Sequence, residues 1–263
     1  MKFVNLISVS CSLLLSSTFI ANVHAQENKQ QQGKTWGLSI GQLLISAPLF
    51  TGSDEYKFNS SPIINGYVNL SEQSTLFINE SDIRLNYQLS NKLSIGILGN
   101  ARSEENRSKG DHSNNSSNIE SAFEVGSYLS YQLTNQLEIG IDSLFDVSST
   151  HDGWITNFNA SYEHWVPSDS IAITSLAGLN YASSGYNNTY YGVNSSTTGT
   201  PQFALKGGFN SATIGTVFSY KTSEHLSLIG LISVTQIIGD AKDSPIVTNN
   251  TLTATGVGLV YAF

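Results

Sequence analysis

Large and small residues alternate along the final stretch of the chain, from Thr251 to Phe263. The odd positions include Val257, Leu259 and Tyr261, whereas the even positions are mostly Ala and Gly. A period of two places these sets on opposite faces of a β-strand, one suited to lipid and the other to a crowded barrel interior. The pattern predicts a closing strand of a transmembrane β-barrel, with Tyr261 and Phe263 as its assembly signal.

The same period extends over two central segments, residues 119–133 and 136–148. The first shows it clearly. Phe123, Val125 and Leu129 share one parity, and the acid Glu124 lies on the other. Lys or Arg on the lipid face near the bilayer centre costs about 2–4 kcal/mol, and an acid costs less, so the acids are expected to point inward. A soluble barrel or sandwich would show the inverse arrangement. Periodicity does not separate the two cases; the predicted signal peptide and the terminal Phe263 favour the membrane barrel.

The fold class is therefore predicted as all-β, an antiparallel transmembrane β-barrel of twelve strands. The third and fourth strands are short and joined around Asn79–Ser81, so ten strands is the alternative. The strands are expected near residues 36–47, 61–71, 74–79, 82–89, 92–103, 119–133, 136–148, 153–165, 169–183, 203–221, 225–239 and 251–263.

Three segments of similar sequence are predicted to contain tight turns between strands. Each ends one strand with Tyr, turns through Ser or Thr, and begins the next strand with Leu: Tyr87–Gly96, Tyr131–Gly140 and Tyr220–Gly230, with Tyr162–Asp169 as a looser fourth copy. Ser and Thr favour turns because their hydroxyls bond nearby backbone groups. The alternating links are longer and polar: residues 48–60, 103–118, 184–202 and 240–250. Short turns are expected on the periplasmic rim and long links outside the cell.

The N-terminal residues predict a secretory signal peptide over residues 1–25. Lys2 precedes an apolar stretch, and small residues surround a cut before Gln26. A membrane-anchor helix is the alternative, which the short apolar core disfavours. A short polar segment, residues 26–35, would then precede a barrel over residues 36–263. The one cysteine, Cys11, lies in the signal, so the mature chain has no disulfide, thiolate nucleophile or cysteine-ligated metal.

The low charge content and the negative net charge of the chain indicate which kinds of partner it can bind. Charged residues make up 12% of the chain, about half the fraction of a typical soluble domain. The formal net charge is −8 and becomes more negative once Lys2 is removed. Nucleic acid is excluded as an expected partner, because the chain has no basic patch that would replace phosphate counterions. Outer-membrane lipid, lipopolysaccharide and the barrel assembly machinery are the expected partners of a monomer.

Several short segments resemble the MltA-interacting protein (MipA)/OmpV family of outer-membrane proteins, and together they extend over most of the mature chain. They are Ala47–Asp54, Ser61–Asn65, Tyr190–Val193, Asp243–Val247 and the closing Tyr261–Phe263. Phe50 stands where the family pattern has Tyr, and residues 103–118 carry nothing of the pattern. The resemblance implies a Gram-negative outer-membrane barrel that acts as a scaffold between a murein synthase and a murein hydrolase. Other members are porin-like or adhesive surface proteins.

Five acids have the parity of the barrel interior: Glu124, Glu138, Asp142, Asp146 and Glu163. With Arg84 and Lys206 as possible partners, they would line either a cation-preferring pore or a polar plug held by ion pairs. The plug is favoured, because the inward side chains of a barrel this narrow largely fill it.

Two acid–histidine pairs, Asp111–His112 and His151–Asp152, are candidates for acid–base chemistry. We interpret both as solvated loop residues, because no nucleophile or metal-binding motif accompanies them. The protein is therefore expected not to be an enzyme, with no catalytic residue, cofactor or metal. Asp243–Val247 is interpreted as a turn in the last long link, and Tyr190–Gly192 as a strand end or loop packed into the barrel mouth.

If the scaffold role is correct, its contacts are expected on the short periplasmic turns. These are Ser90–Lys92, Thr134–Gln136, Pro167–Asp169 and Ser223–His225.

Overall fold

The computed structural model describes residues 35–107, 118–193 and 202–263. The predicted signal peptide and nearly all of the polar segment after it lie outside these residues, as does Asp111–His112. The described chain forms a closed barrel in which every strand is antiparallel to its neighbours and the last strand pairs with the first. The strands are β1 (Trp36–Pro48), β2 (Tyr56–Asn69), β3 (Ser74–Asn79), β4 (Asp82–Gln88), β5 (Leu93–Arg102), β6 (Ala122–Gln132), β7 (Leu137–Asp146), β8 (Trp154–Glu163), β9 (Ile171–Ala182), β10 (Gly208–Lys221), β11 (Leu226–Ile237) and β12 (Thr251–Ala262). The prediction of a twelve-stranded antiparallel barrel is confirmed.

The outer face of the barrel is apolar and is bordered by aromatic residues at both ends. The outward positions of the twelve strands carry no Asp, Glu, Lys or Arg. Exposed aromatic residues near one end are Trp36, Tyr87, Tyr131, Tyr162, Tyr220 and Tyr261. Exposed aromatic residues near the other end are Tyr56, Phe58, Phe123, Phe145 and Phe209. An apolar band between two aromatic girdles is the surface that a bilayer requires.

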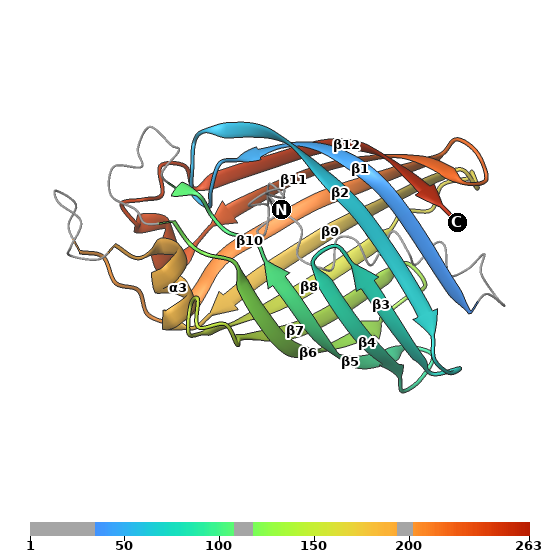
Figure 1. Cartoon of the computed structure of the whole chain (residues 1–263), viewed down its shortest axis with the longest axis horizontal. Helices are drawn as coiled ribbons and strands as arrows, with labels where there is room; N and C mark the ends of the chain where they lie inside the picture. Colours follow the sequence, from blue (N-terminus) through green and yellow to red (C-terminus); the bar gives the residue numbers. More distant parts are fainter. Residues whose placement is uncertain (1–34, 108–117, 194–201) are drawn as a thin grey trace, which may run out of the picture.

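The two ends of the barrel differ in their connections. β1 begins and β12 ends at the same rim, to which the short turns also belong, as Figure 1 shows. The backbone N–H of Phe263 donates to the Leu38 carbonyl at that rim. The opposite rim carries the long links, the helix α3 (Ser184–Tyr191) and the short helix η2 (Gly239–Asp243). No helix in the described part of the chain is long and apolar enough to cross a membrane.

The predicted starts of two strands are wrong, and one helix was missed. β10 begins at Gly208 instead of residue 203. β2 begins at Tyr56 instead of residue 61, because Tyr56 and Phe58 alternate with polar residues while the whole stretch pairs with β1. The prediction also missed α3, whose residues were placed in a long link, so Tyr190 and Tyr191 end a helix and not a strand or a loop. The sequence of α3 has no apolar period, and contacts with the barrel stabilise it.

β3 and β4 form a hairpin that is shorter than the rest of the wall. β3 pairs with β2 only between Asn65 and Asn69. The preceding part of β2, Tyr56–Ile64, pairs with β1 alone among the described residues. In the following text the segment Tyr56–Ile64 is called the β2 edge.

Candidate functional site

The barrel interior holds a buried polar network near the long-link rim. Glu124, at the start of β6, has 1% of its surface exposed. Arg102, at the end of β5, donates to both of its carboxylate oxygens at 3.0 and 3.1 Å. Asn100 donates to one of these oxygens at 2.7 Å, and His151 Nε2 lies 3.0 Å from the other. The carboxylate is therefore held from three sides, as a buried charge requires.

His151 belongs to this network, and its interpretation as a solvated loop residue is wrong. Its side chain is fully buried, with Nδ1 3.9 Å from the Asp146 carboxylate. Asp146 also accepts hydrogen bonds from the backbone N–H groups of His151 and Asp152, which fixes the short link after β7. The link was interpreted as solvated because it is short and polar, but these bonds turn the imidazole into the barrel.

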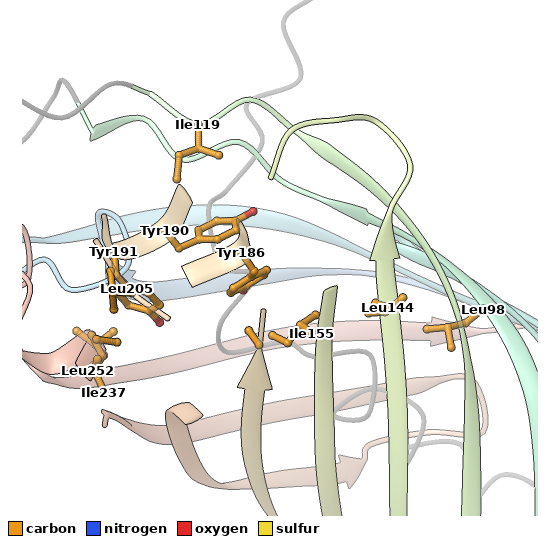
Figure 2. Close-up of a cluster of buried hydrophobic side chains, with 12 residues drawn as sticks. Leu98, Ile119, Leu144, Ile155, Tyr186, Tyr190, Tyr191, Leu205, Ile237 and Leu252 are labelled. Carbon is orange, nitrogen blue, oxygen red and sulfur yellow. The ribbon is translucent and has the colours of Figure 1, made fainter. Parts of the chain in front are cut away.

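The helix α3 covers the network with tyrosines. Tyr186 and Tyr190 lie with their ring centroids 5.2 and 5.8 Å from the Arg102 guanidinium carbon, within cation–π range. Figure 2 shows both rings projecting from α3 toward the side of the barrel where Ile155 and Leu144 lie. Burial raises the pKa of Tyr186 to about 12 and that of Tyr190 further, so both phenols are neutral at physiological pH. The prediction that Tyr190 and Tyr191 pack into the barrel mouth is confirmed.

Hydrogen bonds from several segments hold α3 in place. Ser183 caps its N-terminus by accepting from the Tyr186 N–H. Arg107 donates to the Tyr190 carbonyl at 2.6 Å, and Ser244 donates to the Tyr191 carbonyl. Ser244 belongs to the segment Asp243–Val247, whose Val247 N–H donates to the Ser244 carbonyl. This segment therefore forms the predicted turn, and it also anchors the helix.

A second polar group lies further from the mouth. Asp142 accepts from Asn157 at 2.6 Å and from Asn159 at 2.9 Å. Arg84 pairs with Asp82 at 3.1 Å, and its guanidinium carbon lies 5.6 Å from the Tyr128 ring centroid. The salt bridge of Arg84 is with Asp82, an acid outside the predicted set, although its charge also acts on Glu138 and Asp142. The Lys206 side chain is exposed.

The remaining predicted residues also have inward positions. Glu138 lies on β7 two residues before Gly140, and Glu163 ends β8; both are partly buried. Sequence reasoning missed Arg102 as the partner of Glu124. The parity of Arg102 in β5 indicates an inward side chain. Pairing it with Glu124 also requires the register that places Arg102 opposite Ala122.

The short-turn rim has a repeated construction. In each of four turns two consecutive N–H groups donate to one carbonyl, namely those of Ser74, Leu93, Leu137 and Leu226. In each turn a hydroxyl also accepts from backbone N–H groups further along; the hydroxyls belong to Ser71, Ser90, Thr134 and Ser223. The turn at Leu70–Ser74 therefore replaces Tyr162–Asp169 as the fourth copy. The short turn between β8 and β9, at residues 164–170, has another geometry and an exposed Trp165.

The arrangement contains fixed ion pairs and capped turns, and it includes no group of three or more His, Asp or Glu residues suited to a metal ion within the described ranges. The His151 ring packs against the Tyr186 ring at a centroid distance of 5.1 Å, and its Nε2 lies 3.0 Å from Glu124 Oε1.

Comparison with known proteins assigns a family. A family model described as MltA-interacting protein MipA matches residues 40–263. The outer membrane protein Omp26La of Vibrio anguillarum is 28% identical over 119 residues, which cover 45% of this chain and 46% of that protein. The match therefore spans about half the length of this relative.

Solved structures of other barrels are similar at low identity. The NanC porin is 12% identical, with a TM-score of 0.47 over 85% of this chain and 98% of the porin. The translocator domain of the autotransporter NalP from Neisseria meningitidis is 9% identical, with a TM-score of 0.45 over 96% of this chain and all of that domain, 100%.

Proposed function

Because the chain belongs to the MltA-interacting protein MipA family, we propose that this outer-membrane barrel is a scaffold whose short-turn rim binds murein-acting enzymes. The proposed partners are a murein-degrading transglycosylase and a murein synthase, as the resemblance of the sequence motifs implies. The observation that supports the scaffold role is the repeated, hydroxyl-capped construction of four turns on one rim. Such turns present their tip residues at fixed positions, so a partner loses little conformational entropy in binding them.

The structure of the opposite end of the barrel favours an interaction role and disfavours a wide channel. α3 and its tyrosines occupy the mouth, and the Arg102–Glu124 pair below them is buried. Buried ion pairs of this kind are costly to separate, which favours a filled interior. A small-solute channel or a surface adhesin is the alternative function.

The proposal is tested by changing the tips of the turns and leaving their caps intact. The rim variant carries Ala at Asn91, Lys92, Asn135, Gln136 and Glu224, and retains Ser90, Thr134 and Ser223. We expect co-purification of the transglycosylase to fall about tenfold, which corresponds to about 1.4 kcal/mol of binding free energy. The measurement is affinity capture from solubilised envelopes, quantified by mass spectrometry.

A matched control carries Ala at exposed residues of the opposite rim: Lys206, Asp240 and Lys242. It should capture the enzyme as the unchanged protein does. Equal capture by all three proteins, together with stepwise conductance in planar bilayers, would replace the scaffold by the channel.

A further inference from the structure

Polar side chains gather inside the barrel where the β3–β4 hairpin ends against β2. The β2–β3 ladder ends at the opposed pair Asn65 and Asn79, and Figure 1 shows the hairpin ending part of the way along β2. Both asparagines alternate with exposed neighbours, Ile64 and Ile78, so their side chains face the barrel interior. Opposed side chains on one face of a ladder have Cβ atoms about 4.5–5.5 Å apart, which is close enough to bind one ligand together.

The start of β4 and the turn before it contribute to the same group. Asn79 Nδ2 donates to Asp82 Oδ1 at 2.9 Å, and Arg84 Nε donates to the same oxygen at 3.1 Å. Glu80, in the turn between β3 and β4, accepts hydrogen bonds from its own backbone N–H and from that of Ile64. We call the residues of this group the polar cluster: Asn65, Asn79, Glu80, Asp82 and Arg84.

Four buried oxygen atoms of the polar cluster have no hydrogen-bond partner among the described residues: Asn65 Oδ1, Asn79 Oδ1, Glu80 Oε2 and Asp82 Oδ2. In both carboxylates one oxygen accepts the bonds described above, and the other has no donor. Asn65 has 5% and Asp82 3% of its surface exposed, so both side chains are almost fully removed from solvent. Buried acceptors without a partner are destabilising, so a ligand that satisfies them would stabilise the barrel.

The interior around the polar cluster also carries an excess of negative charge. The charge of Arg84 acts on Glu138 and Asp142 of β7. The charge of Asp82 acts on Asp142 and on Glu80. Four acids therefore lie around one arginine, and uncompensated charge in a buried space is costly. A cation would offset this charge, whereas an anion would be repelled.

We propose that the polar cluster binds Ca²⁺ inside the barrel. Carboxylate and side-chain amide oxygens are both calcium ligands, and water completes a shell of about 6–8 oxygens. Arg84 Nη2, a buried donor without a partner among the described residues, donates to one of these waters. The ligands come from β2, from the end of β3, from the turn and from β4, so the ion braces the short hairpin against its longer neighbour. This site lies inside the barrel and is independent of the scaffold role of the rim.

Two other occupants are less suited to the polar cluster. Mg²⁺ requires a near-ideal octahedron of short bonds and retains most of its water. Water alone would bond the free oxygens and leave the negative charge without compensation. Half of the free oxygens belong to neutral amides, so the expected Kd for Ca²⁺ is that of extracellular calcium modules, about 0.1–1 mM.

The proposal is tested by refolding the full chain from urea into phosphocholine vesicles, with either EDTA or about 10 mM CaCl₂, at least tenfold above the expected Kd. Refolding gives the ion access to the cluster before the barrel closes. We expect CaCl₂ to raise the temperature at which the heat-modifiable band is lost by about 5 °C. MgCl₂ at the same concentration should raise it by less than half as much.

Binding is measured directly with Tb³⁺, a luminescent substitute for Ca²⁺. The Tyr128 ring, whose centroid lies 5.6 Å from the Arg84 guanidinium carbon, is near enough to the polar cluster to excite the bound ion. We expect Tb³⁺ luminescence on excitation of tyrosine, and Ca²⁺ should displace it with the Kd given above.

Variants separate binding of the ion from loss of the fold. Asn65→Leu replaces an orphaned amide by an apolar side chain of similar volume, so the stability in EDTA should be unchanged or higher, whereas the rise with CaCl₂ should fall by at least half. Asp82→Asn should raise the Kd about tenfold, because calcium affinity follows the charge of the ligands. Asp240→Asn, at an exposed acid of the long-link rim, is the control and should respond to calcium as the unchanged protein does.

Heat-modifiable mobility shows which variants are folded, and Asn65→Leu provides the test if Asp82→Asn, which weakens the pairing of Arg84, does not fold. Equal calcium responses of the unchanged protein and the folded cluster variants would overturn the proposal in favour of binding to surface acids. Equal stability of the unchanged protein in EDTA and in CaCl₂ would also overturn it and leave the free oxygens to water.

Discussion

Glu124 illustrates how much a single position reveals before its neighbours are known. Its parity between Phe123 and Val125 predicted an inward side chain, and the residue is buried as expected. Its partners did not follow from that parity. Arg102 and His151 come from separate strands and links, and their approach depends on the register between β5 and β6 and on the bonds to Asp146. Local periodicity contains no information on either.

The Arg102–Glu124 pair is predicted to be costly to break and less costly to remove. Arg102→Met leaves a buried carboxylate without its guanidinium, and the free energy of unfolding should fall by about 3–5 kcal/mol. The double variant Arg102→Met with Glu124→Gln should lose clearly less than the sum of the single variants, because no unpaired charge remains. The measurement is urea unfolding in lipid vesicles, followed by tryptophan fluorescence. Additive losses would show that the two side chains act independently.

At the scale of elements, the strands were predictable and the helix was not. Ten-residue strands such as β5 and β7 carry their own signal, because lipid outside and a crowded interior impose alternation on each of them. α3 has no such signal, since its stability derives from a cap at Ser183 and from anchors at Arg107 and Ser244 that are distant in sequence. The start of β2 was likewise missed, because residues 56–60 read as part of a polar link until their pairing with β1 is known.

Two glycines of β5 provide a matched test of interior packing. A Cβ at Gly96 would lie 2.3 Å from the Leu85 carbonyl oxygen and 2.5 Å from the Tyr128 ring, whereas one at Gly99 would meet nothing within 4 Å. Gly96→Ala should therefore destabilise the barrel by about 1–3 kcal/mol. Gly99→Ala should stay within about 0.5 kcal/mol of the unchanged protein.

Both glycine variants are measured by the temperature at which the heat-modifiable band is lost. Equal midpoints for the two would mean that the wall between β4 and β6 relaxes around the added methyl group at Gly96.

For the whole molecule, the sequence predicted the barrel, its strand number and its membrane, because these follow from repeated local patterns and from the terminal aromatics. The family assignment over residues 40–263 agrees with the resemblance of the short motifs. The interior network and the β2 edge depend on which strands are neighbours and how long each one is. Such relations appear only once the barrel is closed.

Deletion of Phe263 should lower assembly into the outer membrane several-fold. Its N–H donates to the Leu38 carbonyl, and its ring lies 4.9 Å from that of Tyr261. The deletion therefore removes the hydrogen bond that ends the contact between the last strand and the first. Assembly is measured as the heat-modifiable fraction in outer-membrane preparations. Tyr220→Ala, which removes an exposed girdle aromatic at the same rim, is the control and should assemble normally.

The pairing of β12 with β1 also determines when the barrel is completed. Every other ladder joins strands that are consecutive in sequence, so each of them closes over a single turn or link. The ladder between Ser39–Ser46 and Thr255–Ala262 joins the two ends of the chain and has by far the largest sequence separation. Contacts of this kind form late in folding. Until β12 pairs with β1 the sheet keeps two open edges, so this one ladder marks the step from an open sheet to a closed wall.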